Sequence, residues 1–68
     1  MRIRLKRDIL IVVEDTRNNE FWDKPLYKWN EITVETVINN GKTADLVTYD
    51  GVIYRDVLTE SFEVLSPS

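Results

Sequence analysis

The stretch 46–65, LVTYDGVIYRDVLTESFEVL, decides the fold class of this chain. It places the turn dipeptide Asp50-Gly51 between two runs of β-branched and aromatic residues, which is the pattern of a β-hairpin. The short polar segment 56–61 follows, in which 58–61, LTES, is the candidate 3₁₀ turn, and the apolar run 62–65, FEVL, closes the stretch. We therefore expect a hairpin, one turn of 3₁₀ helix and a short last strand.

The other apolar segments also have the period of strands. The segment 2–6, RIRLK, alternates basic and apolar residues, as a half-buried strand does. The run 9–13, ILIVV, is rich in β-branched residues and predicts a more buried strand after a bend at Arg7-Asp8. No continuous apolar stripe recurs at helical spacing, so the sequence predicts an all-β domain.

The segment 14–30, EDTRNNEFWDKPLYKWN, differs from the rest of the chain. Turn-forming residues such as Asn18-Asn19 and Pro25 discourage regular structure here, so we expect one long loop. A loop of this length in a small domain is usually either functional or packed by its own side chains.

The turn signal Asn39-Asn40-Gly41-Lys42 leaves two registers open for the strands around it. In the first, Asn40-Gly41 form a two-residue loop and Ile38 opposes Thr43. This register buries Asp45 among these residues: Ile32, Val34, Ile38, Val47, Tyr49, Val52 and Tyr54.

In the second register, Gly41 is a left-handed bulge residue and Ile38 opposes Lys42. The core face then consists of these residues: Ile32, Val34, Ile38, Ala44, Leu46 and Ile53. We prefer this register because it leaves Asp45 in water, and an unpaired buried carboxylate is costly. With Asp50-Gly51 as a two-residue loop that pairs Tyr49 with Val52, it also predicts an outward patch: Val37, Val47, Tyr49, Val52 and Tyr54.

Size and composition limit what the chain can be. Its 68 residues are enough for one domain, which we place at 1–65 with a flexible tail at 66–68. Disulfides and histidine ligands are excluded because the chain has no cysteine and no histidine. The absence of cysteine fits a cytoplasmic protein, and no apolar run approaches the ~20 residues of a membrane span.

This organisation resembles the SH3-like small barrel. The resemblance covers nearly the whole chain and implies five strands, with 14–30 as the long first loop and 58–61 as the 3₁₀ turn. It also implies that the last strand pairs with the first, so that Arg4 or Lys6 faces Glu63. The family's tyrosine-rich loop motif, adjacent tryptophan pair and 3₁₀ proline are missing. The short, charged chain is also similar to accessory proteins of bacteriophages and mobile elements.

The side chains present do not favour catalysis or a metal site. Without histidine or cysteine, the usual nucleophile and base pairs are missing, and the twelve acidic side chains read as solvated surface. The oxygen ligands of the first loop match no calcium-loop spacing, so we interpret them as turn chemistry: Asp15, Asn18, Asn19 and Glu20. We expect no enzyme activity, no cofactor and no metal.

The aromatic residues predict the function. We expect a protein-interaction module that binds a protein partner through these residues: Phe21, Trp22, Tyr27, Trp29, Tyr49 and Tyr54. Self-association into a homodimer is the alternative use of the same surface, and an acidic inhibitor of a host protein is a variant of the same idea.

Nucleic-acid binding is the rival class, because SH3-like barrels include modules of the KOW and Sm types. The aromatic residues would stack on bases, and these cations would contact phosphate: Arg2, Arg4, Lys6, Lys24 and Lys28. Against this class, residues 8–68 carry a net charge of −7, although the first seven residues are basic.

Overall fold

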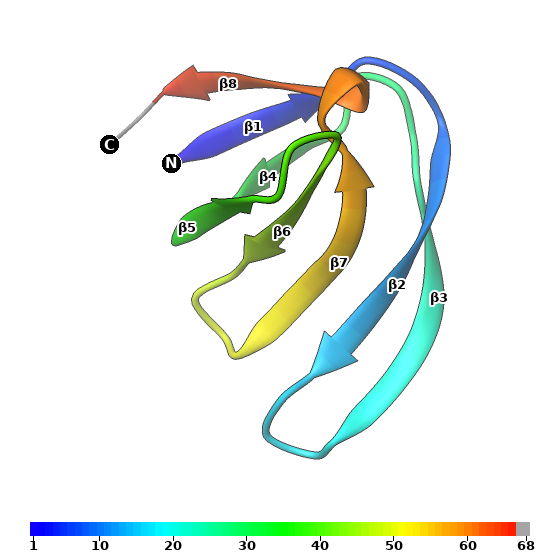
Figure 1. Cartoon of the computed structure of the whole chain (residues 1–68), viewed down its shortest axis with the longest axis vertical. Helices are drawn as coiled ribbons and strands as arrows, with labels where there is room; N and C mark the ends of the chain where they lie inside the picture. The colour runs from blue at the N-terminus through cyan, green and yellow to red at the C-terminus, as the bar shows by residue number, and fades with distance from the viewer. Residues whose placement is uncertain (67–68) are drawn as a thin grey trace.

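The structure, a computed structural model, describes residues 1–66 and consists of β-strands and one 3₁₀ turn (Figure 1). The expectation of an all-β domain is confirmed. The elements follow one another as β1 (Arg2–Leu5), β2 (Ile9–Asp15), β3 (Glu20–Leu26), β4 (Glu31–Thr33), β5 (Thr36–Asn39), β6 (Thr43–Val47), β7 (Val52–Leu58), η1 (Thr59–Ser61) and β8 (Phe62–Ser66). The described residues contain no helix that is long and apolar enough to cross a membrane.

The strands form two antiparallel sheets, and neither closes into a barrel. The smaller sheet has the order β4-β1-β8, and the larger has the order β3-β2-β7-β6-β5. The expected five-stranded barrel is therefore wrong: the described part of the chain holds eight strands in separate sheets of three and five. The chain passes between the sheets at four places, from β1 to β2, from β3 to β4, from β4 to β5 and from β7 to β8. β3 lies at one edge of the larger sheet (Figure 1).

The pairing of the first and last strands is as expected. β1 lies antiparallel to β8, with Arg4 opposite Glu63 and Leu5 opposite Phe62. Nε of Arg4 donates a hydrogen bond of 3.0 Å to Oε1 of Glu63. The 3₁₀ turn precedes β8 as predicted. Ser66, placed in the tail by the sequence, ends β8, and 67–68 lie outside the described residues.

One core holds the two sheets together. Alternation in β1 turns Ile3 and Leu5 inward, and alternation in β2 does the same for Ile11 and Val13. The buried apolar residues belong to strands of both sheets, except for Val34, which lies between β4 and β5: Ile3, Leu5, Ile11, Val13, Leu26, Val34, Ala44, Leu46, Val57 and Phe62. Burial of these side chains is the main stabilising term available to a domain without disulfides.

The expectation of a long loop at 14–30 is wrong. Residues Glu20–Leu26 form β3, which pairs along the whole of β2, from Asp15 opposite Glu20 to Ile9 opposite Leu26. Pro25 has no backbone N–H, and it is tolerated in β3 because this strand lies at the edge of the sheet and has a neighbour on one side only. The irregular chain shrinks to the turn at 16–19 and the connection at 27–30.

Both predicted registers of the hairpin between β5 and β6 are wrong. The N–H of Asn40 bonds to the carbonyl of Thr43, and Ile38 pairs with Asp45. The two-residue loop is therefore Gly41-Lys42. Gly41 has a φ of +93° at the first loop position, where a type II′ turn requires glycine.

The hairpin between β6 and β7 also differs by one residue from the expectation. The N–H of Thr48 bonds to the carbonyl of Val52, so the loop is Tyr49–Gly51 instead of Asp50-Gly51 alone. Gly51 has a φ of +82°, as expected of the left-handed residue that ends a three-residue hairpin loop. Val47 then pairs with Ile53.

With these observed registers, the predicted core face and the predicted outward patch are each correct only in part. Ala44, Leu46 and Val34 are buried as expected, whereas Ile38 is exposed. The single outward patch is wrong, because these three of its members pack against the core: Val37, Val52 and Tyr54.

The preferred register predicts that the side chain of Asp45 faces water, but in the structure this side chain has partners on β7. Its Oδ1 accepts the N–H of Asp56, a bulge residue with a φ of +53°, and its Oδ2 lies 3.6 Å from Nη1 of Arg55. These partners on β7 allow its carboxylate to be largely buried.

Candidate functional site

A row of paired side chains crosses the larger sheet and forms the base of a groove. Val13 of β2 pairs with Trp22 of β3 on one side and with Tyr54 of β7 on the other. Directly paired residues in an antiparallel sheet point to the same face. Val13 is fully buried beneath the two aromatic rings, whereas Trp22 is 42% exposed. The rings therefore stand at the surface on an apolar floor.

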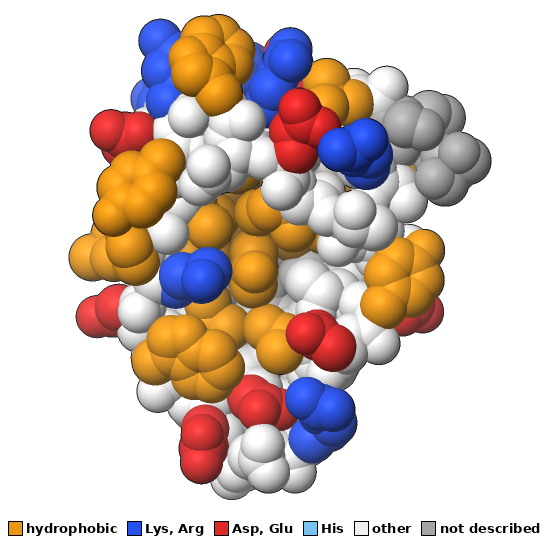
Figure 2. Space-filling view, turned by 180° about the vertical axis from the view of Figure 1, so that it is seen from behind, with side chains coloured by type: hydrophobic (Ala, Val, Ile, Leu, Met, Phe, Trp, Pro, Cys, Tyr) orange, Lys and Arg blue, Asp and Glu red, His pale blue; other side chains and the backbone are white. Residues whose placement is uncertain are grey.

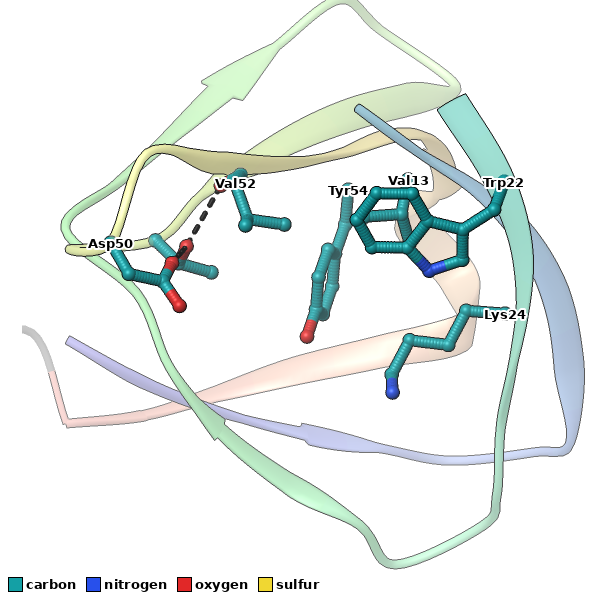
Figure 3. Close-up of a pocket in the computed structure, with 7 residues that line it drawn as sticks. Val13, Trp22, Lys24, Asp50, Val52 and Tyr54 are labelled. Atoms are coloured by element: carbon teal, nitrogen blue, oxygen red, sulfur yellow. Dashed lines mark hydrogen bonds between the residues drawn. The ribbon is translucent and has the colours of Figure 1, made fainter. Parts of the chain in front are cut away.

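The groove is a solvent-open cavity of about 210 Å³. The space-filling view shows a hollow with an apolar floor and charged side chains along its rim (Figure 2). The close-up shows Tyr54 between Trp22 on one side and Val52 and Asp50 on the other (Figure 3). The lining residues come from β2, β3, β7 and the loop before β7: Val13, Trp22, Lys24, Thr48, Asp50, Val52 and Tyr54.

Two polar groups of the groove, Asp50 and Tyr54, have shifted pKa values. The hydroxyl of Thr48 donates to the Asp50 carboxylate, and this bond holds the pKa of Asp50 below its ordinary value of 3.8. Burial, aided by the negative charge of Asp50, raises the pKa of the Tyr54 hydroxyl above its ordinary value of 10.0. The groove thus offers a carboxylate acceptor, a phenol donor and the ammonium group of Lys24.

The loop that carries Asp50 is fixed to the hairpin of β2 and β3. The backbone N–H of Thr16 donates to the carbonyl of Gly51 at 3.1 Å, and its hydroxyl donates to the same oxygen at 2.7 Å. A side chain at Gly51 would meet the aliphatic part of Arg17 at about 3.3 Å. Because the two turns are linked, the Asp50 end of the groove is held at a set position relative to Trp22.

The structure places the six predicted contact residues in three different regions. Trp22 and Tyr54 line the groove, and Tyr49, at 67% exposure, lies in the loop beside it. Phe21 neighbours Trp22 in β3 and therefore points to the opposite face of the sheet. Tyr27 and Trp29 lie in the connection between β3 and β4, and both are exposed. None of the six belongs to the buried core.

Trp29 forms a second aromatic feature, which is not part of the groove lining. Its backbone has a φ of +75°, a conformation that bulky residues rarely adopt. The N–H of Trp29 donates to the carbonyl of Leu5, which ties the connection to β1. Nζ of Lys28 lies 5.0 Å, and Cζ of Arg4 5.5 Å, from the centroid of the ring, within the range of cation–π contacts.

Thr48 and Asp50 were not expected from the sequence to line a binding site. Lys24 was expected only as a phosphate contact, and Val52 only as part of the outward patch. The positions of Lys24 and Asp50 in the sequence are informative once the strand pairing is known. Lys24 is two residues after Trp22, so in a strand both point to one face. Asp50 lies in a turn whose tight geometry projects its side chain beside the strand that follows. The relation between Trp22 and Lys24 was missed because 14–30 was assigned to a loop.

A second cavity and the acidic side chains add no chemical site. The cavity, of about 300 Å³, lies beside the 3₁₀ turn and is lined by Lys42, Leu58, Thr59 and Glu60. The described residues contain no cluster of three or more histidine, cysteine, aspartate or glutamate side chains placed to hold a metal ion.

The oxygen-rich segment that begins at Asp15 is turn chemistry, as the sequence indicated. Oδ1 of Asp15 accepts the backbone N–H of Arg17 at 3.0 Å, and its Oδ2 accepts from Nδ2 of Asn18 at 2.8 Å. Both bonds fix the turn between β2 and β3.

Comparison of the chain with protein-family models, curated proteins and solved structures finds no significant match. The resemblance to SH3-like barrels therefore rests on organisation alone, and the resemblance to bacteriophage accessory proteins rests on the short, charged chain. The site has to be interpreted from its own geometry and chemistry.

Proposed function

We propose that this protein is a non-enzymatic interaction module whose groove receives a short extended segment of a protein partner. The observation that carries the proposal is the pairing of Trp22 and Tyr54 across a buried Val13. Two aromatic rings on a fixed apolar floor provide a large contact area with few rotatable bonds, which is a common feature of binding hot spots.

The size of the groove favours one inserted side chain over an entire small molecule. Its volume of about 210 Å³ is smaller than the ~300–1,000 Å³ typical of pockets that enclose drug-sized ligands. A partner that inserts a single apolar or aromatic side chain would fill it, and the rest of the partner would lie along the rim.

The polar groups match the two kinds of hydrogen-bonding group in a peptide backbone. Lys24 and the Tyr54 hydroxyl are donors for carbonyl groups, and the Asp50 carboxylate is an acceptor for an N–H. Because donors and acceptor are on different strands and loops, an extended segment could use them in succession along the groove.

Nucleic-acid binding is the second candidate, and the cationic surroundings of Trp29 favour it. Several neighbouring cations are already paired with carboxylates, however. Arg2 lies 2.8 Å from Glu31, and Arg4 bonds to Glu63. Ion pairs of this kind reduce the positive potential available to phosphate groups, so we rank this candidate second. A cytoplasmic location stays a prediction.

Selection of displayed random peptides on the purified protein tests the proposal. We expect enrichment of peptides that share one apolar or aromatic residue and lose binding to Trp22→Ala. Tyr27→Ala is the matched control, since Tyr27 is a similarly exposed aromatic residue outside the groove. The absence of any enriched peptide, or equal binding to Trp22→Ala, would contradict the proposed function.

A further inference from the structure

The free edge of β3 is a long, exposed strand with alternating chemistry. Among residues 1–66, β3 pairs only with β2, and it forms one border of the larger sheet (Figure 1). Every residue from Glu20 to Pro25 is exposed, including Phe21 at 61%. An exposed edge presents unpaired backbone groups to any strand that can align with it. The question is which strand has matching side chains.

A second copy of β3 has matching side chains in one antiparallel register. Two identical strands pair about a two-fold axis, so one residue lies opposite itself. If that residue is Trp22, each Glu20 lies opposite Lys24 of the other copy, and two opposite-charge pairs form on the face of the sheet that bears the groove. Opposite charges placed directly across strands are favourable.

The neighbouring registers are less favourable. An axis through Asp23 sets two aspartates opposite each other, and an axis through Lys24 does the same for two lysines. Like charges directly across strands are unfavourable. An axis through Phe21 leaves Lys24 outside the strand-to-strand overlap. The sequence of β3 therefore selects the register centred on Trp22.

The same register covers the exposed aromatic side chains of the strand. The two Trp22 side chains lie opposite each other on one face. On the other face, Phe21 lies diagonal to Phe21 and Pro25 of the second copy, a spacing that aromatic side chains can bridge. Pro25 lies just outside the overlap, which runs from Glu20 to Lys24, so its missing N–H removes no bond from the new ladder.

We propose that the protein forms a two-fold symmetric dimer through antiparallel pairing of two β3 edges, centred on Trp22. The larger sheets of the two copies then join into one continuous sheet. The dimer needs no ligand in the groove, so its test does not depend on peptide binding, although Trp22 and Lys24 belong to both surfaces.

Sedimentation equilibrium over a range of concentrations tests the dimer by charge reversal. The 8.0 kDa chain should show twice its mass in the wild type. Glu20→Lys and Lys24→Glu should each be monomeric at the same concentrations, because each sets like charges across the axis. An equimolar mixture of these two variants should recover the doubled mass, because every cross-strand pair is then complementary.

Glu35→Lys is the matched control, since it makes the same charge change at an exposed position outside β3. It should remain dimeric. A wild type that stays monomeric at the highest concentration would overturn the proposal. A dimer whose mass is unchanged by both reversals would overturn it as well, because another surface would then form the contact.

Discussion

Trp22 and Tyr54 lie on the two strands that flank β2, and both pair with Val13. Their separation is therefore set by the hydrogen-bonded ladder of the sheet and not by flexible loops. A site built on paired strands is held more precisely than a site on loop tips, which reduces the ordering cost of binding. This relationship distinguishes the groove from the other exposed aromatic residues of the chain.

Substitution of the groove tryptophan tests whether it is a contact residue or a core residue. Trp22→Ala should leave the domain folded and lower its stability by less than the ~3–5 kcal/mol typical of a buried tryptophan, because Trp22 is 42% exposed. Chemical denaturation followed by circular dichroism measures the loss. Complete unfolding of the variant would show that the ring is an essential part of the core.

Two leucine substitutions compare the two sides of the sheet directly. Leu46 is fully buried and Leu10 is 69% exposed. Leu46→Ala should cost roughly 2–5 kcal/mol and unfold much of so small a domain. Leu10→Ala should change stability by no more than about 0.5 kcal/mol. Similar losses in both variants would mean that the assigned core face is wrong.

The pair Arg4 and Glu63 should couple the two ends of the chain. A double-mutant cycle with Arg4→Ala and Glu63→Ala should give a coupling of ~0.2–1 kcal/mol, since both side chains are partly exposed. The coupling should decrease as salt is added. Arg2 and Glu31, a more exposed pair on the other side of β1, provide the comparison and should couple less. A zero coupling at low salt would argue against the pairing of β1 with β8.

Asp15 should make the stability sensitive to acid. The hydrogen bond from Asn18 lowers the pKa of Asp15 below its ordinary value of 3.8 in the folded state. Its contribution is therefore present above pH 3.8 and is lost as the pH falls through the lower, folded-state pKa. Thermal melts of the wild type and Asp15→Asn should converge on acidification below pH 3.8. Melting temperatures that stay parallel would contradict this role.

The sequence was sufficient where a local pattern decides the structure. The alternation of Arg2-Ile3-Arg4-Leu5, the 3₁₀ turn and the last strand could all be predicted. The pairing of the first and last strands was implied by the resemblance to the SH3-like barrel, which left either Arg4 or Lys6 opposite Glu63, and the structure has Arg4 there. Each of these features depends on residues close in sequence, or on complementary strands at the two ends of a short chain.

The sequence-based predictions were wrong where the environment of a residue depends on a partner that is distant in the sequence. Pro25 indicates a loop until β3 is known to be an edge strand. Asp45 indicates a solvent-facing position until Arg55 and the N–H of Asp56 are found beside it. Strand β3 has only one buried residue, Leu26. Because the strand has no buried face, its sequence lacks the alternation of apolar and polar residues by which a strand is recognised.

The groove could be predicted only in part for the same reason. The aromatic content of 14–30 pointed to Trp22, and the strand pattern brought Tyr54 into the same set. Their meeting across Val13 depends on the register of three strands, and the hairpin turns alone did not determine it.

The most direct test of peptide binding in the groove is to follow the indole N–H signals of the protein by NMR. The chain has two tryptophans, so the spectrum contains one signal for Trp22 and one for Trp29, which Trp29→Phe assigns. Titration with a selected peptide should shift the Trp22 signal to saturation and leave the Trp29 signal in place. A shift of the Trp29 signal alone, or of neither signal, would contradict binding in the groove.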